Sequence, residues 1–137
     1  MDMPTPPPSI RDTYAVTEWI NEYASKDKIH AYNRSQHGEV FTPLSTVREM
    51  LASVPRRFWR NPHIRLLDPA AGLGQFSTVA YQILMTSLST WEPDATRRHE
   101  HIIRNIIHQV ELNPKHAVSL RKIFGPQANI HRGDYLK

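Results

Sequence analysis

Apolar residues near the start of the chain recur with the spacing of amphipathic helices. The first pattern predicts a helix from Ser9 to about Ala31, since Ser9 and Asp12 resemble a capping box with Asp in place of Glu. Its apolar face comprises Val16, Trp19, Ile20, Tyr23 and Ala24. The second pattern predicts a helix capped by Thr42, with Pro43 as its first residue, that ends at Pro55.

From Ile64 onward, short apolar runs typical of strands alternate with helical patterns, which indicates an α/β fold with a parallel sheet. The predicted strands are residues 64–68, 106–112 and 128–131, and the predicted helices are residues 75–88, 94–105 and 114–124. Asn113 is the expected cap of the last helix, with Pro114 at its first position, and Gly125 ends it. The expected strand order is 3-2-1, half of a doubly wound sheet.

The composition predicts a proline-rich leader and gives a weak indication of a polyanionic partner. Four of the first eight residues are proline, which predicts a disordered leader over residues 1–9. We expect an N-terminal helical region over residues 10–62 and the sheet domain over residues 63–137. The net charge of +4 is compatible with a polyanionic partner. The chain has no cysteine, which excludes disulfides and thiol catalysis and favours an intracellular location. No apolar run is long enough for a membrane span.

The candidate chemistry gathers at the ends of the three predicted strands. Asp68, Glu111 and Asp134 each follow a strand, and ligands of open parallel sheets bind beyond those ends. The segment from Asp68 to Phe76 joins the first strand to a helix through a turn of small residues with two glycines, so a ligand can approach its backbone closely.

A nicotinamide or flavin dinucleotide is one alternative for this loop, and S-adenosylmethionine is the other. The dinucleotide fingerprint requires a third glycine where Ser77 stands, and an acid about 20 residues downstream, whereas Glu111 is much farther away. An acid at position 68 also suits an amino or sulfonium group better than a diphosphate. The pattern therefore favours S-adenosylmethionine.

Four segments resemble, in order, motifs of the adenine-N6 DNA methyltransferases of restriction–modification systems. His37–Pro43 contains the Phe-Thr-Pro motif, and Asp68–Phe76 is similar to the Asp-Pro-Ala-Cys/Ala-Gly-x-Gly-x-Phe cofactor loop. Val110–Pro114 resembles the segment whose acid holds the ribose, and Gly133–Tyr135 resembles the segment whose Asp accepts a hydrogen bond from the adenine amino group.

The resemblance implies a Rossmann-like S-adenosylmethionine methyltransferase fold with an N-terminal helical extension, and DNA as partner. The residues that it places around the cofactor are Phe41, Thr42, Pro43, Asp68, Pro69, Ala70, Gly72, Gly74, Phe76, Glu111 and Asp134. Phe41 would lie beside the methionine end of the cofactor. The expected location is intracellular, in the cytoplasm, or in the nucleus of a eukaryotic or viral host.

The chain departs from this family in one motif. Adenine-N6 enzymes hold the target amino group with an Asn/Asp-Pro-Pro-aromatic tetrapeptide, which these 137 residues lack. We therefore assign no catalytic residue and expect little methyl transfer by this chain alone. The open edge of the first strand predicts either a fragment or truncated gene product, or a half-domain that is completed by self-association or by a second polypeptide. The alternatives are a non-catalytic methyltransferase-like module for cofactor binding or assembly, and a basic nucleic-acid-binding module without cofactor.

Two basic clusters are the remaining candidates. Arg56, Arg57 and Arg60 surround Trp59 and could bind phosphates with Trp59 as a stacking surface, although a solvated basic turn with a docked Trp59 is the favoured interpretation. The cluster from Arg97 to Arg104 has the composition of a solvated helix face, and its histidines lack the helical spacing of a zinc site, so we predict no metal.

Overall fold

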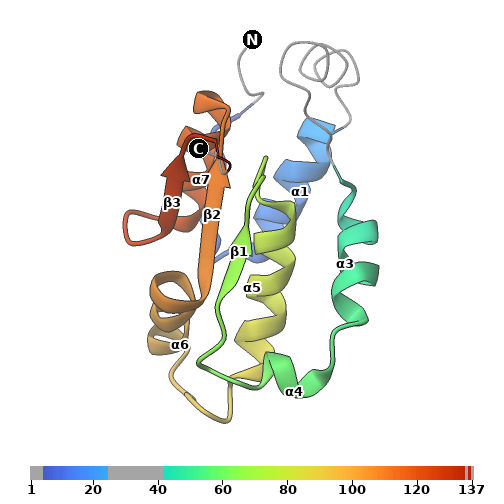
Figure 1. Cartoon of the computed structure of the whole chain (residues 1–137), viewed down its shortest axis with the longest axis vertical. Helices are drawn as coiled ribbons and strands as arrows, with labels where there is room; N and C mark the ends of the chain where they lie inside the picture. Colours follow the sequence, from blue (N-terminus) through green and yellow to red (C-terminus); the bar gives the residue numbers. More distant parts are fainter. Residues whose placement is uncertain (1–4, 25–41, 135, 137) are drawn as a thin grey trace.

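A computed structural model describes residues 5–24, 42–134 and 136 of the chain. Within these residues the polypeptide forms six α-helices, one π-helical turn and three strands (Figure 1). In chain order they are α1 (Thr13–Ala24), α3 (Leu44–Ala52), α4 (Arg56–Trp59), β1 (Leu66–Asp68), α5 (Gln75–Ser87), α6 (Ala95–His101), η1 (Ile102–Ile106), β2 (Ile107–Glu111), α7 (Pro114–Phe124) and β3 (Asn129–Arg132). No described helix is long and apolar enough to cross a membrane.

The three strands form one parallel sheet in the order β1-β2-β3, which is the predicted order 3-2-1 read from the other edge. Leu67 is paired in register with His108, and Glu111 with Arg132. The α/β class and the parallel sheet are therefore confirmed. Among the described strands β1 pairs only with β2, and the side chain of Leu67 on β1 is half-exposed. The predicted open edge is present.

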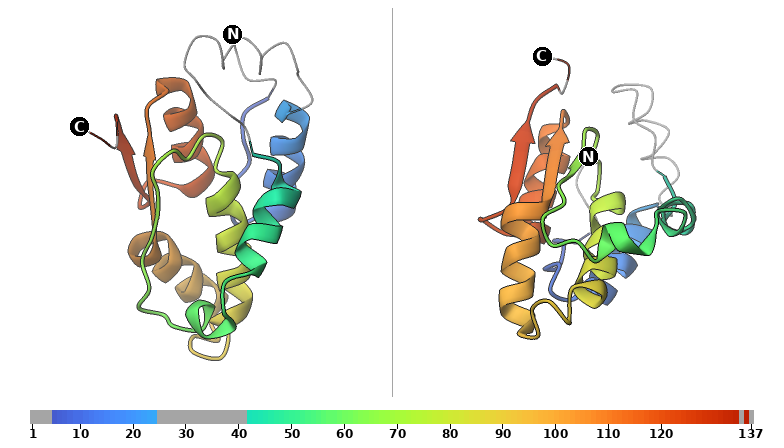
Figure 2. Two further views of the ribbon diagram at one scale, coloured as in Figure 1. Left: turned by 45° about the vertical axis from the view of Figure 1, so that its right-hand side comes forward. Right: turned by 60° about the horizontal axis from the view of Figure 1, so that its bottom comes forward.

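The helices lie in two layers against the sheet (Figure 2). Helices α5 and α7 pack on the strands, and α1 and α3 pack on α5. In Figure 1, α7 lies behind β2 and β3. Val16 and Val47 bring α1 and α3 into the same core as Leu84 of α5 and Leu120 of α7, because all four side chains are fully buried. The N-terminal helices are thus part of the main core.

The first helix begins at Thr13, so the prediction of a start at Ser9 is wrong. The Asp12 Oδ1 accepts a hydrogen bond of 3.0 Å from the Ala15 N–H and caps the helix, whereas the Ser9 Oγ accepts one from Arg11 in the preceding turn. Aspartate fills the cap position here because its carboxylate reaches the free N–H groups of the first turn. Residues 25–31, the predicted end of this helix, lie outside the described residues.

The predicted leader is anchored where it is described. The Trp19 indole N–H donates a 2.9 Å hydrogen bond to the Thr5 carbonyl, and the Ile10 N–H donates one of 2.8 Å to the Ile123 carbonyl. These bonds tie residues 5–10 to α1 and α7. Residues 1–4 lie outside the described residues.

The second helix also starts differently from the prediction. Pro43 is its N-cap, no side chain makes a capping bond, and Thr42 precedes it as a half-buried residue. The predicted Thr42 cap is therefore wrong. The helix ends at Ala52, and Pro55 is instead the N-cap residue of the short helix α4, which begins at Arg56.

The predicted helix over residues 94–105 is present in two parts. The Asp94 carboxylate caps α6 by accepting a 2.9 Å hydrogen bond from the Arg97 N–H. After His101 the helix widens into η1 and passes directly into β2. This arrangement buries Ile102, Ile103 and Ile106.

The other predicted helices, α5 and α7, agree with the sequence patterns within a residue. The Asn113 Oδ1 caps α7 by accepting a hydrogen bond of 2.9 Å from the Lys115 N–H, with Pro114 in the first turn. Gly125 ends α7 with a φ of +91°, a conformation that glycine adopts at low cost.

Candidate functional site

The loop between β1 and α5 requires both of its glycines, for different reasons. Gly72 and Gly74 have φ angles of +59° and +88°, which side chains rarely adopt. At Gly74 a Cβ atom would also lie 3.0 Å from the Phe124 ring and 3.1 Å from Leu120. At Gly72 the Cβ would meet only the Gln75 amide oxygen, at 3.3 Å. Gly74 is thus fixed by packing against α7, whereas Gly72 permits the turn itself.

The backbone N–H groups of the loop donate hydrogen bonds to other atoms of the protein. The Ala70 N–H donates to Asp68 Oδ1 at 3.2 Å, and the Ala71 N–H donates to the Val110 carbonyl at 2.9 Å. The Leu73 N–H donates to the Gln75 side-chain oxygen at 3.2 Å, and the Gly74 N–H donates to the Ala71 carbonyl. With Gly72 bound to Glu111, as described next, each amide from residue 70 to 74 has a partner. The loop is held rigidly and does not present these amides to an anion.

Glu111 connects the loop after β1 to the loop after β2. Its Oε1 accepts a 2.6 Å hydrogen bond from the Gly72 N–H, and its Oε2 accepts one of 2.9 Å from the Asn113 N–H. Its backbone carbonyl accepts a third from Gly133 at 2.9 Å. The residue is only 5% exposed, so the alternative of a solvated acid at a strand end is wrong.

Asp68 is the least compensated carboxylate at this edge of the sheet. Its Oδ1 accepts the Ala70 N–H, and its Oδ2 is buried with no hydrogen-bond partner among the described residues. Burial raises the pKa of this carboxyl, and the Ala70 hydrogen bond opposes the rise. The side chain borders a hollow of about 50 Å³ between β1, β2 and the first turns of α5. A buried acceptor without a donor is suited to a ligand amino group.

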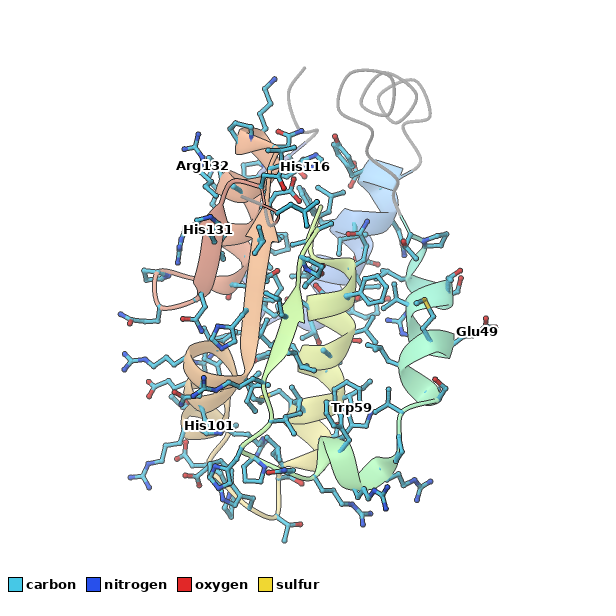
Figure 3. All side chains as sticks on the ribbon, viewed as in Figure 1. Glu49, Trp59, His101, His116, His131 and Arg132 are labelled. Atoms are coloured by element: carbon cyan, nitrogen blue, oxygen red, sulfur yellow. The ribbon has the colours of Figure 1, made fainter. Side chains whose placement is uncertain are left out.

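Asp134 follows β3 at the same end of the sheet. Gly133 donates to the Glu111 carbonyl, so the turn that carries Asp134 is attached to the end of β2. The Asp134 Oδ1 accepts a 2.8 Å hydrogen bond from the Leu136 N–H, and the residue is half-buried. The three predicted acids therefore lie at one edge of the sheet, as expected for the carboxyl ends of parallel strands. Figure 3 marks this end by Arg132 on β3 and His116 on α7.

The other predicted cofactor residues are partly placed. Pro69 and Ala70 are exposed on the loop, and Phe76 is half-buried in the first turn of α5. Thr42 and exposed Pro43 precede α3, which packs along α5. Phe41, the predicted wall of the methionine end, lies outside the described residues.

Two polar residues of the site were missed by sequence reasoning. Gln75 is 6% exposed and holds the Leu73 N–H with its side-chain oxygen. Asn113 was predicted as a helix cap, yet its own N–H also anchors the Glu111 carboxylate. In the sequence, the only signal for Gln75 is its position as a polar residue at the start of a predicted helix.

The basic clusters have mainly structural surroundings. Trp59 is 5% exposed and packs edge-on against Phe58 at 5.2 Å between ring centroids, so the interpretation of a docked Trp59 is confirmed. The His99 Nδ1 is 2.7 Å from the Tyr81 hydroxyl, and the His101 Nε2 is 2.6 Å from the Pro62 carbonyl. Burial lowers the pKa of His99.

The chain matches no protein-family model and no curated protein.

Proposed function

We propose that this chain is the S-adenosylmethionine-binding part of an adenine-N6 DNA methyltransferase. The observation that carries the proposal is the Glu111 carboxylate, which the end of β2 holds 2.6 Å from the Gly72 N–H of the glycine loop. A carboxylate in that position can accept hydrogen bonds from the two hydroxyls of a ribose. Asp68, whose Oδ2 has no donor among the described residues, would receive the amino group of the methionine part.

The charge of the site supports S-adenosylmethionine over a dinucleotide. Asp68 and Glu111 both border the loop, and the amides of residues 70–74 already have partners. A diphosphate needs free N–H groups and is repelled by carboxylates. S-adenosylmethionine has a cationic sulfonium, an amino group and two ribose hydroxyls, each of which is attracted by a carboxylate. Asp134 would complete the site through the adenine amino group.

The second candidate function is a non-catalytic module that retains the loop for its architecture. The observation that favours it is that Glu111 joins three chain segments, through Gly72, Asn113 and Gly133, and is 5% exposed. A residue with that many internal bonds is needed for the fold whether or not a cofactor binds.

Calorimetric titration with S-adenosylmethionine tests the proposal. We expect saturable binding at one site and a loss of at least tenfold in affinity for Asp68→Asn, which keeps the shape of the side chain. Glu49→Gln is the matched control, because Glu49 is an exposed acid on α3 whose side chain makes no ion pair or hydrogen bond with another described residue (Figure 3). The absence of binding to the unmodified chain, with thermal unfolding showing it to be folded, would contradict cofactor binding and leave the nucleic-acid-binding module.

Methyl transfer is tested separately, because the tetrapeptide that adenine-N6 enzymes use is absent from these 137 residues. We expect this chain to bind S-adenosylmethionine and to transfer little labelled methyl to unmethylated DNA. Transfer restored by a second polypeptide that carries the tetrapeptide would favour the enzyme over the non-catalytic module. Rapid transfer by this chain alone would show that other residues receive the adenine.

A further inference from the structure

A hollow to which no function has been assigned lies at the end of α5 remote from the glycine loop. It has a volume of about 900 Å³ and lies between α4, the end of α5 and the turn that follows. Its lining includes Trp59, Ile83 and Trp91, together with the arginines Arg56 and Arg60. The residues of α5 that line it run from Ile83 to Ser87 and lie about 12–18 Å along the helix axis from Gln75, at the loop end of the helix. It is therefore separate from the cofactor site.

A second hollow of about 370 Å³ extends this one along the groove between α3 and α5. The two share Arg56, Trp59 and Ile83, and the second adds Arg48 of α3. The result is a continuous groove with an apolar floor and three arginines along it. Figure 3 shows Trp59 at the α4 end, where the two hollows meet.

The arginines at the α4 end have free charges. Arg56 and Arg60 are exposed, and neither makes an ion pair or side-chain hydrogen bond within the described part of the chain. Guanidinium groups without an internal partner are available for phosphates. Arg57, on the same short helix, borders neither hollow.

The aromatic surface of the groove is Trp91. This side chain is 47% exposed, whereas Trp59 is buried and forms only a wall. Its ring centroid is 4.6 Å from that of His101, which is held in turn by the Pro62 carbonyl. Trp91 is thus a positioned and accessible indole beside free arginines, the combination on which unpaired bases stack.

From this arrangement we propose that the groove binds a single strand of nucleic acid. A base stacks on Trp91, the phosphates contact Arg56 and Arg60, and the strand continues toward Arg48. The length of the groove and its three cations favour a strand over a free nucleotide. A duplex is disfavoured because its bases are stacked on one another and do not reach the indole. The proposal does not depend on S-adenosylmethionine binding.

The test is fluorescence anisotropy of a labelled oligothymidylate with the full chain, without cofactor, at several salt concentrations. Two phosphate contacts predict a slope of about −1.4 for the logarithm of the association constant against that of salt. Arg56→Gln and Arg60→Gln should each reduce the slope by about 0.7, and the matched control Arg57→Gln should not change it. Trp91→Leu should weaken binding by about 5- to 150-fold, and Trp91→Phe should weaken it less.

Several results would overturn the proposal. The first is an equal change of the salt slope by Arg57→Gln and Arg56→Gln, and the second is an unchanged affinity for oligothymidylate in Trp91→Leu. The third is an affinity for a duplex, polyglutamate or thymidine monophosphate that equals the affinity for oligothymidylate. If the Trp91 variants do not fold, the unmodified protein still decides, because quenching of its tryptophan fluorescence by the single strand but not by the duplex is required.

Discussion

Asp68→Asn is predicted to stabilise the free protein while weakening its binding of S-adenosylmethionine. The substitution retains an acceptor for the Ala70 N–H. It replaces a buried carboxylate oxygen, which has no hydrogen-bond partner in the part of the chain that the structure describes, by a neutral amide. An unsatisfied buried polar group costs about 1–3 kcal/mol, and a charged one costs more. Removal of the charge should therefore increase the free energy of unfolding by about 1 kcal/mol near pH 8, which raises Tm by about 3 °C for a chain of this length.

The pH dependence identifies the carboxylate as the cause. Burial raises the pKa of Asp68 above its ordinary value of 3.8, so the native state binds more protons than the unfolded state just above that pH. The stability of the unmodified protein relative to Asp68→Asn therefore falls as pH rises through this window. The difference is absent below pH 3.8 and constant once the native carboxyl is ionised. Urea unfolding across this range measures it.

Asp94→Asn is the matched control for this prediction. Its Arg97 hydrogen bond lowers the pKa of exposed Asp94, and asparagine caps helices as well as aspartate does, so no increase in stability is expected. If Asp68→Asn destabilises the protein at neutral pH, the carboxylate has a favourable partner and the reasoning is wrong. Saturating S-adenosylmethionine should reverse the order of the Tm values, because only the unmodified protein would supply the charge for its amino group.

Three further predictions concern the fold. Gly74→Ala should destabilise the protein by about 2 kcal/mol more than Gly72→Ala, because both residues have a positive φ but only at Gly74 would an added Cβ meet the buried side chains of Phe124 and Leu120. Urea unfolding of the pair measures the difference, and equal effects would disprove the packing role. The stability of the unmodified protein should fall as pH drops below 6.5, because burial lowers the pKa of His99 and the unfolded state therefore binds more protons than the native state. His99→Gln should reduce this loss of stability, which thermal unfolding at a series of pH values measures. Trp19→Phe removes the hydrogen bond to the Thr5 carbonyl and should lower the free energy of unfolding by about 1 kcal/mol. Removal of residues 1–8 from this variant should lower the free energy of unfolding little further, and a large additional loss would mean that other contacts hold the leader.

The strand and helix pattern was predictable because its signals are local. The Asn113 cap, the adjacent proline and Gly125 fix the ends of α7 through atoms only a few residues apart. The same reasoning failed at Thr42 and Ser9, where several residues in one turn could start a helix. At the first helix the carboxylate of Asp12 caps, and at the second helix no side chain does. Competition among neighbouring caps is decided by how the helix packs, which a local pattern does not contain.

For the site, the sequence by itself determined which residues follow the parallel strands, and hence that Asp68, Glu111 and Asp134 share one edge. Only the tertiary structure decided what each acid does there. Glu111 meets Gly72 across 39 positions of the chain and is buried, whereas Asp68 has a carboxylate oxygen to which no described residue donates. The groove with Trp91 and Arg56 likewise depends on the packing of α3 and α4 against α5. Burial and partners arise from contacts between distant segments, and no pattern of neighbouring residues specifies them.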